Sequence, residues 1–234
     1  MTDDRDLQGL DPYDLMDAEA ARLDRYFSGL GAADWSRPSR CAGWSVRDVL
    51  AHLLASEDYN HASLEGTVGA FLASWGEKGA TDLTSANEIG IRGLDDQSTD
   101  QLIAGWRVAN AETRAKFRER DGDDVDTSVG AYPARWQAFH LAFELAIHAD
   151  DVGVPVTAEE AEGRLAWEAA FGRFALEELD KGLELDGSSG STHVKGDGID
   201  TDVPDALFVA AVAARLEPDA PLDAEQRALL SATP

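Results

Sequence analysis

Three side chains on one apolar segment could bind a metal ion or move a proton. The segment RWQAFHLAFELAIHADDVG, residues 135–153, has no proline, and no glycine before its last residue, and it places His140, Glu144 and His148 at steps of four. Residues four apart lie on one face of a helix, so Glu144 and His148 can reach one point above it. Two ligands are too few for a catalytic metal site, which usually takes three from the protein and leaves one position open.

His52 is the best candidate for a third ligand. It interrupts the apolar stretch RDVLAHLLASE, far from Glu144 in sequence. Neighbouring helices of a bundle can bring such distant positions together, which would let His52, Glu144 and His148 bind one divalent metal. The spacing alone leaves open that each histidine is a hydrogen-bonded core residue, the commoner role of a lone histidine on an apolar face.

The roles of the neighbouring polar residues depend on that metal. His140 could be a fourth ligand, but four protein ligands are typical of structural zinc, so we interpret it as a pocket wall or as a catalytic proton carrier. Asp151 could accept an imidazole N–H of His148, as metal-bound histidines usually require, and Asp150 is the alternative partner. Otherwise the two aspartates form a solvated pair at a helix C-terminus, where negative charge is unfavourable.

Two arginines and one cysteine are further candidates. Arg92, in ANEIGIRGLDD, and Arg135 could bind an anionic substrate, although salt bridges explain both equally well in so acidic a chain. Cys41 has no histidine near it in sequence, so a buried structural thiol is a better interpretation than a nucleophile.

The composition limits the partners and the compartment. Forty-five acidic residues against 20 basic ones give a formal charge of −25, which repels nucleic acids and anionic membranes but says little about a substrate. The single cysteine and the absence of an apolar leader in MTDDRDLQGLDPYDLMD predict a cytoplasmic protein. The longest apolar run, DALFVAAVAARL, is too short to cross a bilayer. We expect a monomer or a homodimer.

The elements that must position these residues are mainly helices. Apolar residues at helical spacing predict four long helices, with polar or glycine-rich connections between them, over residues 15–29, 46–75, 99–121 and 135–152. Ser45 and either Ser98 or Thr99 are the expected caps of the second and third, and Thr157 with Glu160 begins a fifth. Short strand-like pieces and another helix follow. We predict a mostly α fold: a four-helix bundle with crossover connections over residues 1–155, and a small C-terminal α+β unit over residues 156–234.

Two separated motifs resemble one known family. The stretch RPSRCAGWSVRDVLAHLLASE resembles the opening of the mycothiol-dependent maleylpyruvate isomerase family, a branch of the DinB/YfiT-like metal-binding superfamily, which typically shows Cys-x-Gly-Trp-Ser/Thr-Val-Arg-Asp ahead of a histidine. The stretch FELAIHADD resembles the family's Glu-x-x-x-His followed by Asp. The resemblance covers roughly residues 10–155. It implies a DinB-like bundle in which His52, Glu144 and His148 bind a divalent metal, usually zinc, with an open position that receives the thiol of mycothiol.

This resemblance implies an enzyme that is a mycothiol-dependent isomerase or S-transferase. Such an enzyme would activate the thiol as a metal-bound thiolate for addition to a small electrophile. Two alternatives remain: a metal-dependent hydrolase that uses coordinated water, and a non-catalytic protein that binds a metal or a small molecule. The superfamily contains several reactions, so the fold does not choose between them.

Overall fold

The structure is a computed structural model, and it describes residues 3–196 and 198–232. These residues divide into two compact units: a bundle unit, Asp11–Val154, and a sheet unit, which contains the residues up to Leu10 and those from Pro155 on. The division falls one residue before the expected boundary. Residues 3–10, which the sequence analysis placed in the first domain, group with the sheet unit.

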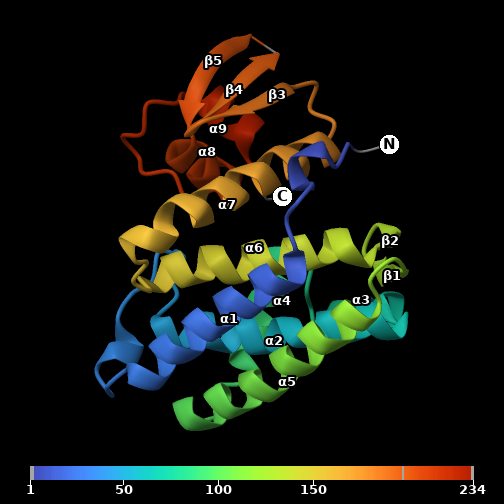
Figure 1. Ribbon diagram of the computed structural model, residues 1–234. Coiled ribbons are helices and arrows are strands. Elements are labelled where there is room, and N and C mark those ends of the chain that lie inside the picture. Colours follow the sequence, from blue (N-terminus) through green and yellow to red (C-terminus); the bar gives the residue numbers. More distant parts are fainter. Residues whose placement is uncertain (1–2, 197, 233–234) are drawn as a thin grey trace. The chain divides into compact units, whose positions relative to one another are not determined.

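Four long helices build the bundle unit (Figure 1). They are α1 Pro12–Gly29, α2 Val46–Glu65, α5 Thr99–Glu119 and α6 Ala134–Val152. Helix α1 packs against α5 and α6, and α2 packs against α5. Large aromatic side chains fill the space between them: Phe27 of α1 and Trp106 of α5 are both buried and meet edge to face, with ring centroids 6.0 Å apart. The predicted mostly helical bundle is confirmed.

The connections of the bundle unit contain more structure than the sequence indicated. The helix expected over residues 46–75 is two helices, because Gly66 adopts a left-handed backbone conformation (φ 72°) that ends α2, and α3, Val68–Glu77, begins after it. The expected polar connection contains α4, Leu83–Arg92, capped by Asp82. A hairpin of β1, Asp124–Thr127, and β2, Gly130–Pro133, precedes α6. A short 3-10 turn, Asp34–Ser36, follows α1.

Capping at Ser45 fixes the start of α2, the helix that carries His52. The Asp48 backbone N–H donates to the Ser45 hydroxyl at 3.3 Å, and the Ser45 backbone N–H donates to the Asp48 carboxylate at 2.8 Å. This reciprocal pair satisfies N–H groups that the first helical turn leaves unpaired. Ser98 caps α5 in the same way, so Ser98 rather than Thr99 is the cap of that helix. Thr157 likewise caps α7, Ala158–Glu178, as predicted.

A buried carboxylate joins α2 to α5. Glu57 is 3% exposed, and it accepts hydrogen bonds from Asn110 Nδ2 at 2.8 Å, Thr113 Oγ1 at 2.6 Å and Asn60 Nδ2 at 3.0 Å. A buried carboxylate is tolerated only when its oxygens are hydrogen-bonded, so this network defines one rotation of α2 against α5. That rotation also determines where His52, five residues earlier on α2, points.

The sheet unit is a small α+β structure. Its elements are a 3-10 turn, Arg5–Leu7, α7 Ala158–Glu178, β3 Glu184–Ser188, β4 Ser191–Gly196, β5 Ile199–Pro204, α8 Asp205–Val212 and α9 Ala224–Leu230. The strands form an antiparallel sheet in the order β3-β4-β5. Leu185, Thr192, Val194 and Val203 are buried on one face of the sheet, and α7 and α8 contact its strands. The strand-like pieces expected near residue 183 are therefore real strands.

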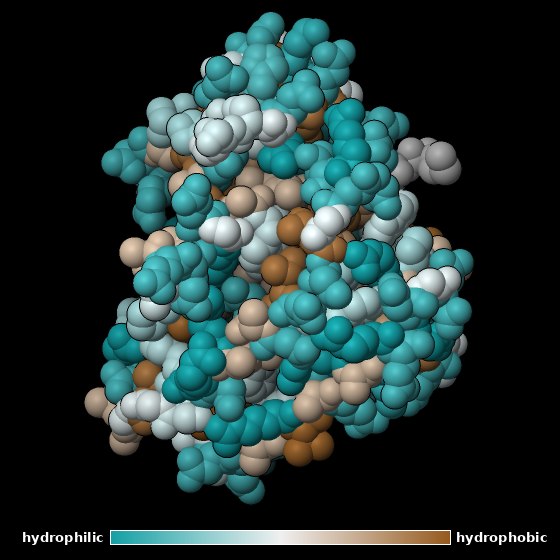
Figure 2. Space-filling model, viewed as in Figure 1, coloured by the Kyte–Doolittle hydropathy of each residue, from teal (hydrophilic) through white to brown (hydrophobic). Residues whose placement is uncertain are grey.

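Hydrophilic residues cover most of the face seen in Figure 2, in agreement with the formal charge of −25. Among the described residues, no helix is long and apolar enough to cross a membrane.

Candidate metal centre

Helices α2 and α6 bring the three predicted ligands together. His52 Nε2 lies 2.9 Å from Glu144 Oε1, and His148 Nε2 lies 3.2 Å from the same oxygen. The two imidazole ring centroids are 4.8 Å apart, with their planes at 68°. One ligand atom from each of the three residues lies within 4.8 Å of the others. The sequence prediction that these side chains converge therefore agrees with the geometry, and their role as metal ligands is a proposal developed below.

The spacing of these atoms fits a small divalent cation. Ligand bonds of about 2.0–2.2 Å in a tetrahedral site separate neighbouring ligand atoms by roughly 3.4 Å. The two contacts to the Glu144 carboxylate, 2.9 and 3.2 Å, are shorter, as expected of direct hydrogen bonds that an ion would replace. Two imidazoles and one carboxylate are also a known donor set of catalytic zinc. The imidazole side chains are 6% exposed, whereas that of Glu144 is 47% exposed. A small molecule can thus approach the site from the side of the carboxylate.

Asp151 supports His148 from behind. Its Oδ2 atom lies 3.1 Å from His148 Nδ1, and the Asp151 side chain is fully buried. An N–H at Nδ1 that donates to this carboxylate leaves Nε2 as the ligand atom. Of the two predicted partners, Asp151 therefore makes the contact with the imidazole, while a role for Asp150 stays a prediction.

The electrostatics of the cluster favour charged forms in the metal-free protein. Desolvation of the Glu144 carboxylate against the two buried imidazoles would raise its pKa, although the side chain is half exposed, but the charge and hydrogen bond of His148, together with the hydrogen bond of His52, hold that pKa well below its ordinary value. Burial would lower the pKa of His148, but the charge of Glu144 and the hydrogen bonds to Asp151, Cys41 and Glu144 raise it well above its ordinary value. A metal must therefore displace a tightly held proton from His148.

Removing the charge of Asp151 should weaken metal binding without removing a ligand. We expect Asp151→Asn to lower zinc affinity by about tenfold or more, because a neutral amide is a poorer acceptor for the Nδ1–H of a metal-bound imidazole. Competition with a chromophoric chelator measures this affinity. Asp150→Asn, one residue earlier in α6, is the matched control and should stay within about twofold of the unchanged protein. Equal losses in both variants would argue against the specific role of Asp151.

The loop before α2 supplies an aromatic wall of the candidate centre, and the sequence analysis assigned it no contact with the two histidines. The Trp44 ring centroid lies 5.0 Å from that of His52 and 6.5 Å from that of His148. Trp44 Nε1 donates to Glu88 Oε1 of α4 at 2.7 Å, which fixes the indole. The position of Trp44 inside the Cys-x-Gly-Trp motif was the available signal.

His140 lies outside the three-residue cluster. It is one turn before Glu144 on α6, and its Nε2 atom is 3.2 Å from the Tyr132 hydroxyl of β2. His140 is not among the side chains whose ligand atoms gather at the centre, which argues against a fourth ligand and leaves the wall and proton-carrier interpretations open. Its catalytic role stays a prediction.

The two arginines considered as anion contacts both form ion pairs within the bundle unit. The Arg92 side chain is 73% exposed and pairs with Glu88 at 3.3 Å. Arg135 pairs with Asp121 at 3.9 Å and lies over the Phe139 ring. It is nine residues before Glu144, roughly 14 Å along the helix axis. Both arginines thus form the ion pairs that one interpretation expected, and a role for either in substrate binding stays a prediction.

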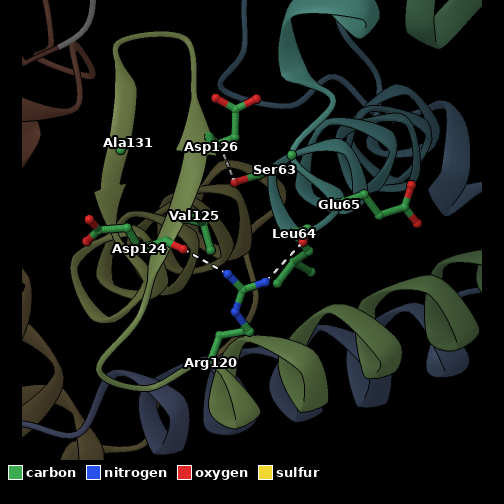
Figure 3. Close-up of a pocket in the computed structure, with 9 residues that line it drawn as sticks. Ser63, Leu64, Glu65, Arg120, Asp124, Val125, Asp126 and Ala131 are labelled. Carbon is green, nitrogen blue, oxygen red and sulfur yellow. Dashed lines mark hydrogen bonds between the residues drawn. The ribbon is translucent and has the colours of Figure 1, made fainter.

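A separate hollow of about 330 Å³ lies at the far end of α2 (Figure 3). Arg120 points into it and donates to the backbone carbonyls of Leu64, at 3.2 Å, and Asp124, at 2.8 Å. Ser63, at its edge, is eleven residues beyond His52, roughly 16 Å along the axis. The Arg120 guanidinium thus joins the end of α2 to the β1–β2 hairpin. We interpret the residues around this hollow as structural rather than as a binding site.

The bundle unit matches the model of a known protein family. Residues 16–153, more than half of the chain, match the family model of the mycothiol maleylpyruvate isomerase N-terminal domain. The chain belongs to this family. The matched residues contain His52, Glu144, His148 and Asp151, so the candidate centre lies inside the family domain.

Solved structures of similar fold carry the same description. The crystal structure of the mycothiol-dependent maleylpyruvate isomerase matches with a TM-score of 0.64 and 20% identity over 92% of each chain. A structure of a histidine-to-alanine mutant of that enzyme matches with a TM-score of 0.61 and 20% identity, again over 92% of each chain. At this identity the likeness establishes the fold, including that of the sheet unit. No curated protein sequence matches the chain.

Proposed function

We propose that the protein is a metal-dependent, mycothiol-dependent isomerase or S-transferase that acts on a small electrophile. The observation that carries the proposal is the approach of two imidazole Nε2 atoms to one carboxylate oxygen, that of Glu144, within the family domain. His52, Glu144 and His148 would hold the divalent ion, with zinc the preferred candidate because of the donor set. A bound ion lowers the pKa of a coordinated thiol, so that the thiol can react as its anion at neutral pH.

The protein's own residues would orient the ion's ligands and exclude water. Asp151 holds a proton at His148 Nδ1, which keeps Nε2 directed toward Glu144. Trp44 covers both imidazoles from one side. His140, held by Tyr132, would accept and return a proton at Nε2 or Nδ1 as the substrate changes.

The reaction that fits this arrangement would start with loss of the thiol proton to a base and addition of the thiolate to a polarised carbon–carbon double bond. A sulfur–carbon bond forms, and the double bond becomes single as its electron pair moves onto the conjugated carbonyl. Rotation about that single bond, return of the electron pair and loss of the thiolate give the trans isomer, whereas protonation of the adduct at carbon gives a conjugate. One protein of similar structure is a maleylpyruvate isomerase. An acid with a maleyl-type cis double bond is therefore the first substrate to test.

One experiment separates this proposal from hydrolysis. Purified protein, analysed for metal, should contain about one divalent ion per chain and should isomerise maleylpyruvate only when mycothiol is present. Mass spectrometry with other electrophiles should detect mycothiol adducts if the reaction stops at transfer. Turnover of an ester or amide without any thiol would instead support the hydrolase. Bound metal without any turnover or adduct would support a binding protein.

A further inference from the structure

A short loop with a fixed conformation lies against the candidate metal centre. The backbone N–H of Ser39 donates to the Trp44 carbonyl at 2.9 Å, and the N–H of Trp44 donates to the Cys41 carbonyl at 3.0 Å. Gly43 makes the turn possible with a φ of 83°, a conformation that residues with a Cβ rarely adopt. The N–H of Arg40 donates to the backbone carbonyl of Asp151 at 2.9 Å. The loop is thus tied directly to the end of α6.

This attachment places the Cys41 thiol against Asp151, the residue whose carboxylate contacts His148. Cys41 Sγ lies 3.0 Å from Asp151 Oδ2, the oxygen that is also 3.1 Å from His148 Nδ1. Cys41 Sγ and His148 Nδ1 are 3.8 Å apart. All three residues are buried. Because an ionised carboxylate can only accept, the S–H donates to Asp151 Oδ2.

The geometry argues against two other roles for this thiol. A nucleophile must be reachable, but Cys41 is only 9% exposed and its S–H points at a carboxylate. Cys41, His148 and Asp151 also form a group with metal-ligand spacing. In that group, however, His148 would contribute Nδ1, the atom that Asp151 needs as a donor if Nε2 is the ligand in the other site. The thiol is better explained as part of the support for His148.

We propose that Cys41 is a positioning residue of the metal centre. Its S–H fixes Asp151 Oδ2 in place, the carboxylate fixes the His148 ring through Nδ1, and the ring keeps Nε2 directed at the metal position. The proposal rests on the proposed function, since it requires His148 to be a ligand. It assigns a purpose to the cysteine of the Cys-x-Gly-Trp motif: the same loop supports one imidazole through Cys41 and covers both through Trp44.

The test compares Cys41→Ala with Cys41→Ser in the full-length protein. Serine retains a hydrogen-bond donor at nearly the same place, and alanine does not. We expect Cys41→Ala to weaken zinc affinity by about three- to tenfold, less than the loss of a direct partner of the histidine, and Cys41→Ser to stay within about twofold. Cobalt-loaded Cys41→Ala should also show shifted visible absorption bands, because the His148 ring loses its fixed orientation.

Controls separate this proposal from the one on which it rests. Thermal unfolding of the metal-free variants shows how much stability each loses, and affinities are measured well below the unfolding transition. Unchanged affinity and cobalt spectrum in Cys41→Ala, or equal losses in Cys41→Ala and Cys41→Ser, would overturn the positioning role. If the unchanged protein and His52→Ala bind metal equally poorly, the proposed metal site itself fails, and that outcome is recognised without either Cys41 variant.

Discussion

His52→Ala should lose most of its bound metal during purification and bind zinc at least about 1,000-fold more weakly than the unchanged protein, equivalent to roughly 4 kcal/mol. The reason is that, in the proposed site, α2 contributes one ligand atom and α6 contributes two. The variant therefore keeps only two ligands from the protein. A catalytic site needs three protein ligands to hold an ion while leaving one position open. Mycothiol-dependent turnover should fall with the metal content. Elemental analysis and chelator competition give the two measurements.

The first control for His52→Ala tests whether the metal-free variant still folds. His52 is 5% exposed beside Trp44, so its removal leaves a small cavity, and the unfolding temperature of the metal-free variant should be compared with that of the metal-free parent. His140→Gln removes a nearby histidine that lies outside the cluster and should retain the metal. If His52→Ala kept a full equivalent of zinc, the group of Cys41, His148 and Asp151 would become the better site.

Local sequence signals predicted the residues that meet at the candidate centre. The steps of four between Glu144 and His148 place both on one face of α6 whatever the rest of the fold does. Ser45 predicted the start of α2, and hence the rotation at which His52 appears, because a capping hydroxyl needs only the next helical turn. Convergence of α2 and α6 depends on tertiary packing. The family resemblance, rather than the spacing, made that convergence an expectation.

The contacts that the sequence could not indicate are long-range or depend on short elements. The hydrogen bond from Trp44 to Glu88 requires α4, the helix that carries Glu88. The α4 sequence resembles a polar connection because its apolar face is small and glycines lie near its ends. The contact of Cys41 with Asp151 joins a loop to a helix end 110 residues later. Neither has a periodic signature. The split of the second helix at Gly66 was missed because a glycine inside an apolar pattern does not by itself show a left-handed backbone.

Zinc affinity should fall steeply as the pH is lowered from 8 to 6. In the metal-free protein, the charge of Glu144 and the hydrogen bonds of the cluster hold the pKa of His148 well above its ordinary value, against the effect of burial. Below that raised pKa the imidazole carries a proton on Nε2, which zinc must displace, so zinc affinity falls by up to about tenfold for each unit by which the pH drops below it. An ordinary histidine would show this dependence only below about pH 6.5.

The change of zinc affinity with pH shows whether zinc displaces the proton on His148 Nε2. Calorimetry in buffers of different ionisation enthalpy should count about one proton released per zinc bound at pH 7. His140→Gln should leave both the slope and the proton count unchanged, because His140 pairs with Tyr132 outside the three-residue cluster. A flat affinity between pH 8 and 6, with no proton released, would mean that His148 is already neutral before the metal arrives. The ion pair with Glu144 would then not exist in the metal-free protein, and the ligand geometry would have to be held by hydrogen bonds alone.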